Sequence, residues 1–367
     1  MRRISFQHVP DEPFWTELKT NVENYFQEKN TSPYANGAMW LKMIVMLLLF
    51  AVPYVLICTM QFSGIVNWLL CLVMGIAMAG IGFCISHQAA HNAVSKKSWV
   101  NRALSLSFNL VGMSDYIWKI KHNVYHHAYT NVYELDEALK EGDLLRLSHD
   151  APYKRVHRWQ HIYGALVYGV FTVFWAFALD FEKLFRYNGH GSRNPESKHP
   201  VSEVLLFVFT KIYYVFIAFI LPHYFFGFTW GEIVTGFLTV HVVASSLITH
   251  VLQVEHLSEE TELVSADESG RVPKTWAVNQ LEGTCNFRTN KIFDWYIGGC
   301  NYQVEHHLFP TICTIHYPAL SRIVEATAKK HGLRYVRHDS FGAALRSHYR
   351  LLRTLGQAPQ IQPALHA

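Results

Sequence analysis

Residues 39–60 read MWLKMIVMLLLFAVPYVLICTM, and residues 65–85 read IVNWLLCLVMGIAMAGIGFCI. Each run approaches the roughly 20 apolar residues that a helix needs to cross a hydrocarbon core. The connection Gln61-Phe62-Ser63-Gly64 is very short and uncharged. Because a spanning segment must satisfy its own backbone hydrogen bonds, the two runs predict a helical hairpin across a bilayer. The sequence therefore indicates an all-α integral membrane protein.

Three further apolar runs occupy residues 162–179, 204–221 and 233–252. Basic residues, which are enriched in cytoplasmic loops, lie in the stretch 86–161, between residues 179 and 204, and after residue 252. If all three runs crossed the membrane, the basic tail would lie outside. Residues 162–179 have basic loops on both sides, so we interpret them as an interfacial helix. Four transmembrane helices, 39–60, 65–85, 204–221 and 233–252, then leave both termini in the cytoplasm.

The remaining segments complete the domain organisation. Residues 1–38 predict an N-terminal cytosolic arm, which is polar and lacks the apolar core of a signal peptide. Residues 39–367 predict one membrane domain, whose cytosolic C-terminal cap is 253–367. No internal repeat and no Gly/Ser-rich or Pro-rich linker divides the sequence.

Composition restricts the function classes. Hydrophobic residues make up 50% of the chain and charged residues only 16%, with a formal net charge of +4. The basic residues form no stripe with interleaved aromatics, which argues against nucleic-acid binding. The six cysteines form no C-x-x-C pair and no regular framework, so structural disulfides are not expected. Histidine, with 22 residues, is the anomaly.

Histidines recur at ligand spacings near the cytoplasmic ends of the predicted spans. His87 and His91 share one helical face, as do His122 and His126, whereas the adjacent His127 points about 100° further round an α-helix. Gln303, His306 and His307 project from one helical surface in the same way. His250 closes the last predicted span. The spacings indicate a site that can serve two metal ions.

The kinds of ligand atom restrict which metal ions the site can bind. Imidazole suits borderline transition metals, whereas Mg²⁺ and Ca²⁺ prefer oxygen. A four-ligand zinc site would leave about half of the histidines unused. Iron also provides O2 chemistry, but the spacing alone does not distinguish iron from zinc.

Histidines outside these groups have a simpler interpretation. His157, His161, His223 and His256, each taken alone, are expected to be satisfied polar groups at a membrane interface. His241, inside the last span, is expected to be a helix-packing contact.

Five passages resemble one known family. They are HQAAH at 87–91, HNVYHHAYTN at 122–131, RWQHIY at 158–163, NFRTN at 286–290 and GGCNYQVEHHLFP at 298–310. Together they are similar to the membrane fatty acid desaturases, and Gln303 in place of a histidine is typical of the front-end branch. Gln88 stands where many relatives have aspartate, and Ser246 stands where acyl-CoA desaturases have asparagine.

The resemblance implies four crossing helices and a cytosolic helical cap that holds two iron ions over the mouth of an acyl tunnel. Its implied ligands are His87, His91, His122, His126, His127, His250, His306 and His307, with Gln303 at or near the site. It also implies an O2-dependent enzyme that introduces a cis double bond into a lipid acyl chain. No catalytic residue apart from the metal site is expected.

Carboxylates, amides and imidazoles commonly orient metal-bound histidines. Candidates for that role are Asn131, Glu134, Asp136, Glu305 and His316. The chain has no H-P-G-G haem motif, since His199-Pro200 is followed by Val201. We therefore expect a separate electron donor, of the ferredoxin or cytochrome b5 type, at the basic cytoplasmic surface. A bacterial inner membrane is favoured over the endoplasmic reticulum.

Two other functions compete. A lipid or hydrocarbon hydroxylase would use the same diiron cap, but its product gains one oxygen whereas a desaturase product loses two hydrogens. A membrane metal transporter would also need histidines, although transporters place ligands near the bilayer midplane.

Overall fold

The computed structural model describes residues 4–60, 62–140, 142–187 and 198–358. The protein is mostly helical, as predicted, and its named strands are only two residues long. Residues 1–3 of the predicted arm and residues 359–367 of the predicted cap lie outside the described residues.

Five continuous helices in the described part of the chain are long and apolar enough to cross a membrane. They comprise α2 (Gly37–Met60); α3 (Gly64–Ile81) with η1 (Gly82–Ser86) and α4 (His87–Ala90); η4 (Arg155–Trp159) with α8 (Gln160–Phe174), η5 (Trp175–Leu179) and α9 (Asp180–Tyr187); α10 (Val201–Val215) with η6 (Phe216–Ile220) and α11 (Leu221–Phe226); and α12 (Trp230–His256). The four predicted crossings each fall in one of them. The fifth contains residues 162–179, so the count of four crossings stays a prediction.

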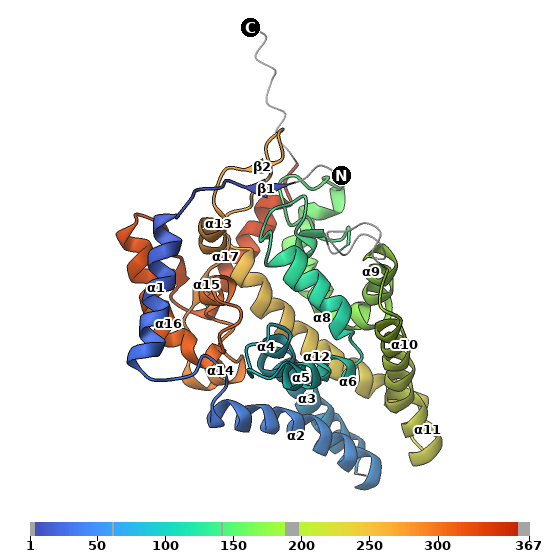
Figure 1. Ribbon diagram of the computed structural model, residues 1–367. Coiled ribbons are helices and arrows are strands. Elements are labelled where there is room, and N and C mark those ends of the chain that lie inside the picture. The colour runs from blue at the N-terminus through green and yellow to red at the C-terminus, as the bar shows by residue number, and fades with distance from the viewer. Residues whose placement is uncertain (1–3, 61, 141, 188–197, 359–367) are drawn as a thin grey trace.

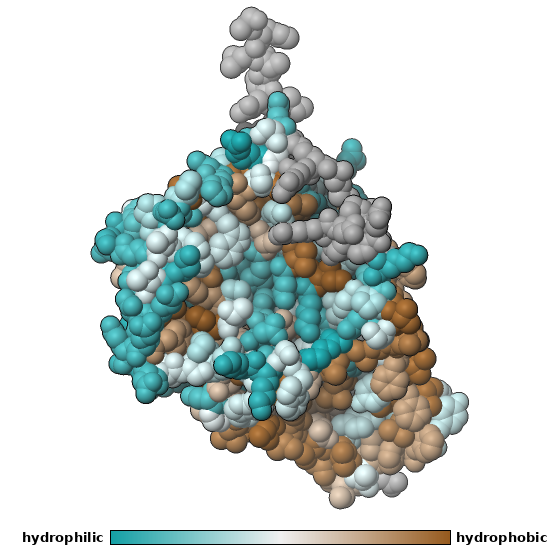
Figure 2. Space-filling model, in the orientation of Figure 1, coloured by the Kyte–Doolittle hydropathy of each residue, from teal (hydrophilic) through white to brown (hydrophobic). Residues whose placement is uncertain are grey.

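The apolar helices gather at one end of the molecule. Figure 2 shows a hydrophobic surface at the lower right, where Figure 1 places α2, α10 and α11. Exposed side chains such as Leu41, Leu205 and Phe209 lie on these helices. A surface of this kind is stable in contact with lipid and costly in contact with water.

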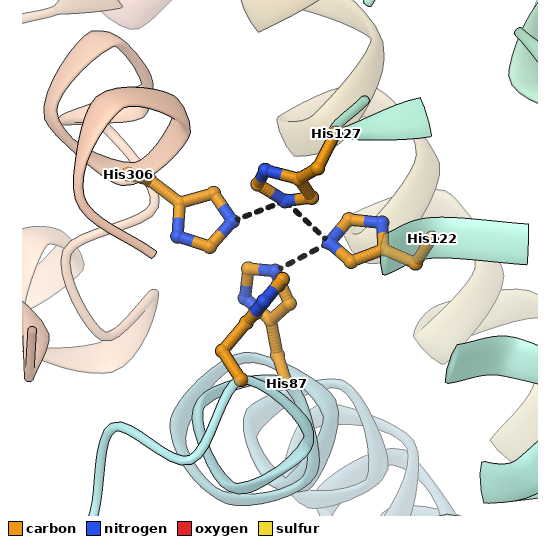
Figure 3. Close-up of side chains that lie close together, drawn as sticks. His87, His122, His127 and His306 are labelled. Atoms are coloured by element: carbon orange, nitrogen blue, oxygen red, sulfur yellow. Dashed lines mark hydrogen bonds between the residues drawn. The ribbon is translucent and has the colours of Figure 1, made fainter. Parts of the chain in front are cut away.

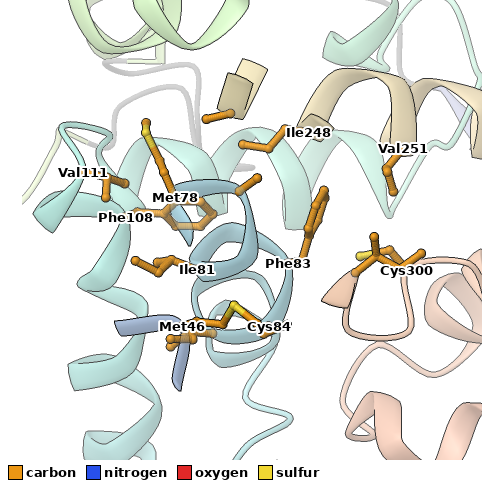
Figure 4. Packing of buried hydrophobic residues seen from close by; sticks show 14 of the residues in the cluster. Met46, Met78, Ile81, Phe83, Cys84, Phe108, Val111, Ile248, Val251 and Cys300 are labelled. Atoms are coloured by element: carbon orange, nitrogen blue, oxygen red, sulfur yellow. The ribbon is translucent and has the colours of Figure 1, made fainter. Parts of the chain in front are cut away.

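Helix α3 packs against both α2 and α12. Figure 4 shows some of the buried side chains between them, among them Met46, Met78 and Ile248. A Cβ atom at Gly75 would lie 2.7 Å from Cβ of Val243 and 2.8 Å from the carbonyl oxygen of Val240. Glycine therefore lets α3 approach the backbone of α12 closely, as small residues do between membrane helices. The resulting core holds Met39, Met43, Met46, Met74, Met78, Phe108, Ala244 and Ile248.

A second, polar part covers the other end of the bundle (Figure 1). Its helices are α1 (Pro13–Glu28), α5 (Ser98–Ser105), α6 (Ser107–Leu110), α7 (Asp115–Lys119), η2 (Ile120–His126), η3 (Glu137–Lys140), α13 (Trp276–Glu282), α14 (Lys291–Tyr296), α15 (Gln303–Leu308), η7 (Thr314–His316), α16 (Tyr317–Lys330) and α17 (Phe341–Leu355). We call this part the cap.

The N-terminal arm is held on the cap by backbone pairing and by a small apolar core. In the arm, β1 (Ser5–Phe6) pairs in parallel with β2 (Arg271–Val272). A separate pair within the C-terminal part joins β3 (Asn286–Phe287) in parallel to β4 (Arg337–His338). Helix α1 packs against α16, and Leu18 and Val324 are both buried there. The arm therefore lies on the same side of the bundle as the C-terminal cap.

Candidate metal centre

Five imidazoles meet where the α3–η1–α4 helix leaves the bundle and enters the cap. The ligand nitrogens of His87, His91, His122, His127 and His306 all lie within 4.8 Å of one another. Figure 3 shows four of these rings pointing toward a common centre. The Nε2 atom of His122 lies 3.0 Å from Nε2 of His87 and 3.1 Å from Nε2 of His127. We call these five residues the first cluster.

Three more imidazoles form a second cluster beside it, made of His126, His256 and His307. The Nε2 atoms of His126 and His256 are 3.3 Å apart, and Nε2 of Gln303 lies 2.9 Å from Nε2 of His256. The rings of His127 and His307 stack with centroids 4.1 Å apart, so the two clusters adjoin. Seven of the eight histidines expected as ligands are therefore brought together, with Gln303 at the edge.

A π-helical turn decides which histidine joins which cluster. Residues Ile120–His126 form the π-helix η2, and the backbone N–H of His127 donates to the carbonyl of His122 at 2.8 Å, an i to i+5 bond. The wider turn aligns His122 with His127 and turns His126 toward the other cluster. The rings of His122 and His126 still stack, with centroids 5.3 Å apart, but their ligand nitrogens belong to different clusters, a division that the α-helical spacing did not predict. Such π-turns are rare and often occur at functional sites.

The buried environment keeps these imidazoles neutral. Burial, followed by the neighbouring imidazoles, holds the pKa of His91, His122 and His127 well below the usual value. The same causes lower the pKa of His306 and His307. A neutral imidazole keeps a lone pair on one nitrogen, which is the form that binds a metal ion.

Several buried nitrogen and oxygen atoms that could bind a metal ion have no hydrogen-bond partner among the described residues. They include Nε2 of His91, Nε2 of His307 and Oε1 of Gln303. Leaving such an atom unpaired costs about 1–3 kcal/mol. Cations bound by both clusters would satisfy these atoms, so the residues present fit a pair of metal ions.

Other side chains orient the rings. Both carboxylate oxygens of Asp136 accept from Nδ1 of His126, at 3.0 and 3.1 Å. The Nδ1 atom of His307 donates to Oε1 of Gln280 at 2.9 Å. A bond at Nδ1 sets the tautomer and directs Nε2 inward. Asp136 thus lies where the sequence predicted, whereas Gln280 was missed because an isolated glutamine carries no spacing signal.

The hydrogen bonds of the other predicted orienting residues go to partners other than the clustered rings. Asn131 acts through the backbone, since its amide donates to the carbonyls of His256, Glu262 and Gly283 at 2.9, 3.0 and 2.9 Å. Glu134 accepts from the backbone N–H of Ala266 at 3.0 Å.

Glu305 and His316 also lie apart from the rings. Glu305 accepts from Asn286 and Tyr335, at 2.7 and 3.0 Å, and burial raises its pKa to about 8. The ring of His316 packs edge-on against Phe26, with centroids 5.0 Å apart. For these two residues the structure supports a role in packing the cap.

His250, which was expected as a ligand, lies outside both clusters. Its Nδ1 atom donates to the carbonyl of Ser246 at 2.7 Å, and its Nε2 atom lies 2.8 Å from the hydroxyl of Tyr349. Helix α12 continues beyond the predicted end at residue 252 and stops at His256. His256, which was expected to be an ordinary interfacial histidine, therefore takes the position assigned to His250.

A cavity of about 120 Å³ connects the clusters with the bundle. His87, His122, His126 and His256 lie in its wall, and apolar side chains supply much of the rest, including Phe108 and Trp175. We call it the proximal cavity. An apolar space that touches both clusters can hold hydrocarbon beside a metal site and keep water away from it.

Comparisons with known proteins agree with this arrangement. The family model described as fatty acid desaturase matches residues 63–338. The “sn-1 linoleoyl-lipid 6-desaturase” of Synechocystis sp. is 32% identical over 93% of this chain and 95% of its own length. The protein of the same name from Arthrospira platensis is 32% identical over 95% of this chain and 94% of its own length. An “Acyl-lipid (8-3)-desaturase” of Physcomitrium patens is 31% identical over 96% of this chain and 74% of its own length.

Proposed function

The chain belongs to the fatty acid desaturase family, and from this membership we propose that it is a front-end desaturase that introduces a cis double bond into the acyl chain of a membrane lipid. It is an oxidoreductase that acts on fatty acyl lipids. The names of its relatives favour a lipid-linked acyl group as the substrate. The observation that carries the proposal is the pair of histidine clusters on the wall of an apolar cavity.

We assign one iron ion to each cluster. His87, His91, His122, His127 and His306 would hold the first ion; His126, His256 and His307, with Oε1 of Gln303, would hold the second. When bound, the two ions would supply the oxidative chemistry: O2, reduced with external electrons, is the oxidant that removes hydrogen from an unactivated methylene. Iron is preferred to zinc because zinc has no redox chemistry.

The protein's own residues position the reaction. The apolar wall formed by Phe83, Phe108 and Trp175 would hold the acyl chain and exclude water. The ring of Trp118 stacks on His122, with centroids 4.1 Å apart, and restricts the rotation of that imidazole. Asp136 and Gln280 keep Nε2 of His126 and His307 directed inward. Electrons are proposed to come from a separate ferredoxin or cytochrome b5 type protein.

Contacts at both ends of the Arg155–Tyr187 helix support a topology of four crossings. At its start, the amide of Gln160 donates to the carbonyl of Leu352 in α17 at 2.7 Å. At its end, the ring of Tyr187 stacks on Tyr125 of η2, with centroids 5.4 Å apart. Because both ends contact the cap, we propose that both ends of this helix lie on the same side of the membrane. The positive-inside rule then favours a cytoplasmic cap.

Product analysis tests the proposal. The protein is expressed in a host with a simple lipid profile, supplied with defined fatty acids, and its lipids are analysed by mass spectrometry. We expect products lighter by two hydrogens; products heavier by one oxygen would support a hydroxylase instead. His307→Ala should abolish the product, whereas His223→Ala should not, because His223 bonds to the carbonyl of Phe228 at 2.8 Å at the opposite end of the bundle. Metal uptake by vesicles without a lipid product would favour transport.

A further inference from the structure

An aromatic side chain connects the first cluster with the protein surface. Trp276 is the first residue of α13, and its indole N–H donates to the backbone carbonyl oxygen of His127 at 3.2 Å. His127 is a member of the first cluster. Because Trp276 is partly exposed, a path of one side chain, one hydrogen bond and one residue leads from the surface to a candidate iron ligand.

The N-terminal arm supplies the outer end of this path. The ring of Trp15, in α1, meets the ring of Trp276 edge-on with centroids 5.5 Å apart, and it packs on Phe309 with centroids 5.3 Å apart. Phe309 ends α15, two residues after His307. Trp15 is also partly exposed. A single surface ring therefore contacts two aromatic side chains, one bonded to the first cluster and the other close in sequence to a histidine of the second.

Two other aromatic side chains near the ligands lack this access. Trp118 stacks on His122, but it lies in the wall of the proximal cavity, where the acyl chain is proposed to bind. The hydroxyl of Tyr317 lies 3.3 Å from Nδ1 of His306, but Tyr317 is only 1% exposed. A soluble protein would have to displace the substrate or open the cap to reach either ring.

The face that carries Trp15 and Trp276 is open to a soluble partner. Figure 1 places α1 and α13 in the cap, whereas α2 and α11 lie at the apolar end of the molecule. Charges of both signs surround the rings: Nζ of Lys19 lies 5.7 Å from the Trp15 ring centroid, and Glu12 precedes α1. The two indole rings, and not the basic surface expected from the sequence, therefore distinguish this face. Weak redox encounters bury little surface, so a small aromatic face is sufficient for one.

We propose that the separate electron donor contacts the protein at Trp15 and that electrons reach the first cluster through Trp276. The proposal rests on the proposed desaturase function and names the face at which electrons enter. Each contact oxidises a one-electron iron protein and reduces one ferric ion held by the clusters. Two such transfers, with two protons and one O2, balance the loss of two hydrogens from the acyl chain and the release of two water molecules.

An indole suits this role because its large delocalised ring spans from the surface to the buried backbone, while its N–H bonds at the inner end. Electron tunnelling is more efficient across a hydrogen bond than across a gap between atoms in contact. The bond from Trp276 to His127 therefore replaces the step at which a path between unbonded groups would be slowest.

Anaerobic stopped-flow mixing tests the path. Reduced plant-type ferredoxin is mixed in excess with the oxidised, iron-loaded protein, and its reoxidation is followed by absorbance; reduced cytochrome b5 is used in a parallel series. Trp276→Phe keeps a ring but removes the N–H, so reoxidation should be several-fold slower even at saturating donor. Iron content and the product of one turnover after chemical reduction should stay unchanged. Reoxidation at the original rate in Trp276→Phe overturns the proposal.

Matched variants separate the path from general loosening. Trp15→Phe should also slow reoxidation, although Trp15 contacts none of the clustered histidines. Trp159→Phe is the control, because Trp159 is 56% exposed and stacks with Arg158 on η4, away from this face. It should leave the rate unchanged, and equal slowing in Trp159→Phe would contradict the path. A photoreactive amino acid in place of Trp15 should capture ferredoxin or cytochrome b5 in the zinc-loaded protein, which accepts no electrons, and capture only from position 159 would contradict the contact face.

A third measurement needs no donor protein. A photoreducing ruthenium complex is attached at Lys19→Cys, beside Trp15, or at the exposed Arg350→Cys on α17, and reduction of the iron is followed after a flash. Trp276→Phe should slow reduction from position 19 but not from position 350; equal rates from position 19 with and without Trp276 overturn the path. Electron transfer through Trp276 without any unsaturated product would contradict the proposed desaturase function and leave the path supported.

Discussion

The carboxylate of Asp136 contacts the imidazole of His126 in the second cluster, and it has no exposed surface. Asp136→Asn keeps the size of the side chain but removes the charge that holds the Nδ1 proton of His126. We expect metal content and desaturation to fall about 10–100-fold. Metal analysis of the purified protein and product analysis measure both. Asp143→Asn is the matched control, because the exposed carboxylate of Asp143 pairs with Lys154 at the surface; an equal loss there would contradict the assignment.

The two histidines at the end of α12 give a sharper comparison. His256→Ala should remove one ligand of the second ion and abolish the product, because the Nε2 atoms of His256 and His126 face each other at 3.3 Å. His250→Ala should retain much of the activity, since both ring nitrogens of His250 already bond to Ser246 and Tyr349. Product yield and iron content are measured for both variants. Loss of metal in His250→Ala with retention in His256→Ala would restore the assignment implied by the family resemblance.

At the scale of single residues, the spacing of the histidines identified most of the site but not which histidine belongs to which cluster. His87, His91, His306 and His307 were predicted because short helical spacings survive in the structure. His256 was missed because a single histidine has no spacing to recognise, and the end of its helix was placed four residues too early. The division between His126 and His127 depends on a π-turn, for which the local sequence gave no indication.

At the scale of helices, one buried ion pair holds α10 against α9. Nζ of Lys211 donates to Oδ2 of Asp180 at 2.7 Å and to the carbonyls of Gly112 and Ala176 at 2.8 and 2.7 Å. Lys211→Met would leave the fully buried Asp180 without its countercharge, and breaking such a pair costs about 3–5 kcal/mol. Thermal unfolding in detergent should show a clearly lower midpoint. Adding Asp180→Asn should recover much of the loss, because the amide removes the unpaired charge and its oxygen can still accept from the backbone N–H of Ser114 or from Nε1 of Trp175; the absence of recovery would contradict this interpretation.

Hydropathy located the apolar helices well and their ends poorly. The predicted span 65–85 lies inside a helix that begins at Gly64 and ends at Ala90, and the predicted span 233–252 lies inside Trp230–His256. The extra turns are those that carry His87 and His256 out of the bundle. Polar residues there lower the hydropathy, while contacts with the cap keep the helix intact. Sequence methods that follow hydropathy therefore end such helices before the functional residues.

At the scale of the whole molecule, the position of the cap at one end of the bundle predicts which loops lie on which side of the membrane. Reporter tags inserted near Phe62 and Phe228 should lie on the side opposite to tags near Lys97 and Gly332, because the first pair lies at the far ends of α2, α3, α11 and α12. Accessibility of the tags in sealed vesicles measures this. Tags at Lys97 and Gly332 on opposite sides would contradict both the four-crossing topology and a shared metal centre.

Acid should destabilise the metal-free protein. Burial lowers the pKa of His348 to about 4, and its Nε2 atom lies 3.0 Å from the hydroxyl of Tyr168. The unfolded chain, with a histidine pKa near 6.5, binds the proton more readily. This contribution is therefore complete above about pH 6.5 and is lost as the pH falls toward 4, by up to about 3 kcal/mol. Unfolding midpoints between pH 7 and pH 4 measure it, and His348→Gln should show a smaller decline.

The sequence predicted the general architecture, namely apolar helices that carry a polar histidine-rich cap. It could not predict how the arm attaches, because β1 and β2 are only two residues long and pair across more than 260 residues. The proximal cavity was equally inaccessible to it, since it depends on how side chains from several helices pack. Only long apolar segments and short ligand spacings could be recognised from the sequence.

His126 and His127 are consecutive residues in different clusters, and so are His307 and His306, so two peptide units join the two candidate ion sites. Because each peptide unit is planar, a backbone shift at a ligand of one site displaces the neighbouring ligand of the other site. Occupation of the two sites should consequently be cooperative. In a metal titration followed by native mass spectrometry, species with one ion should stay scarce at every ratio, and the apo form should convert directly to the form with two ions.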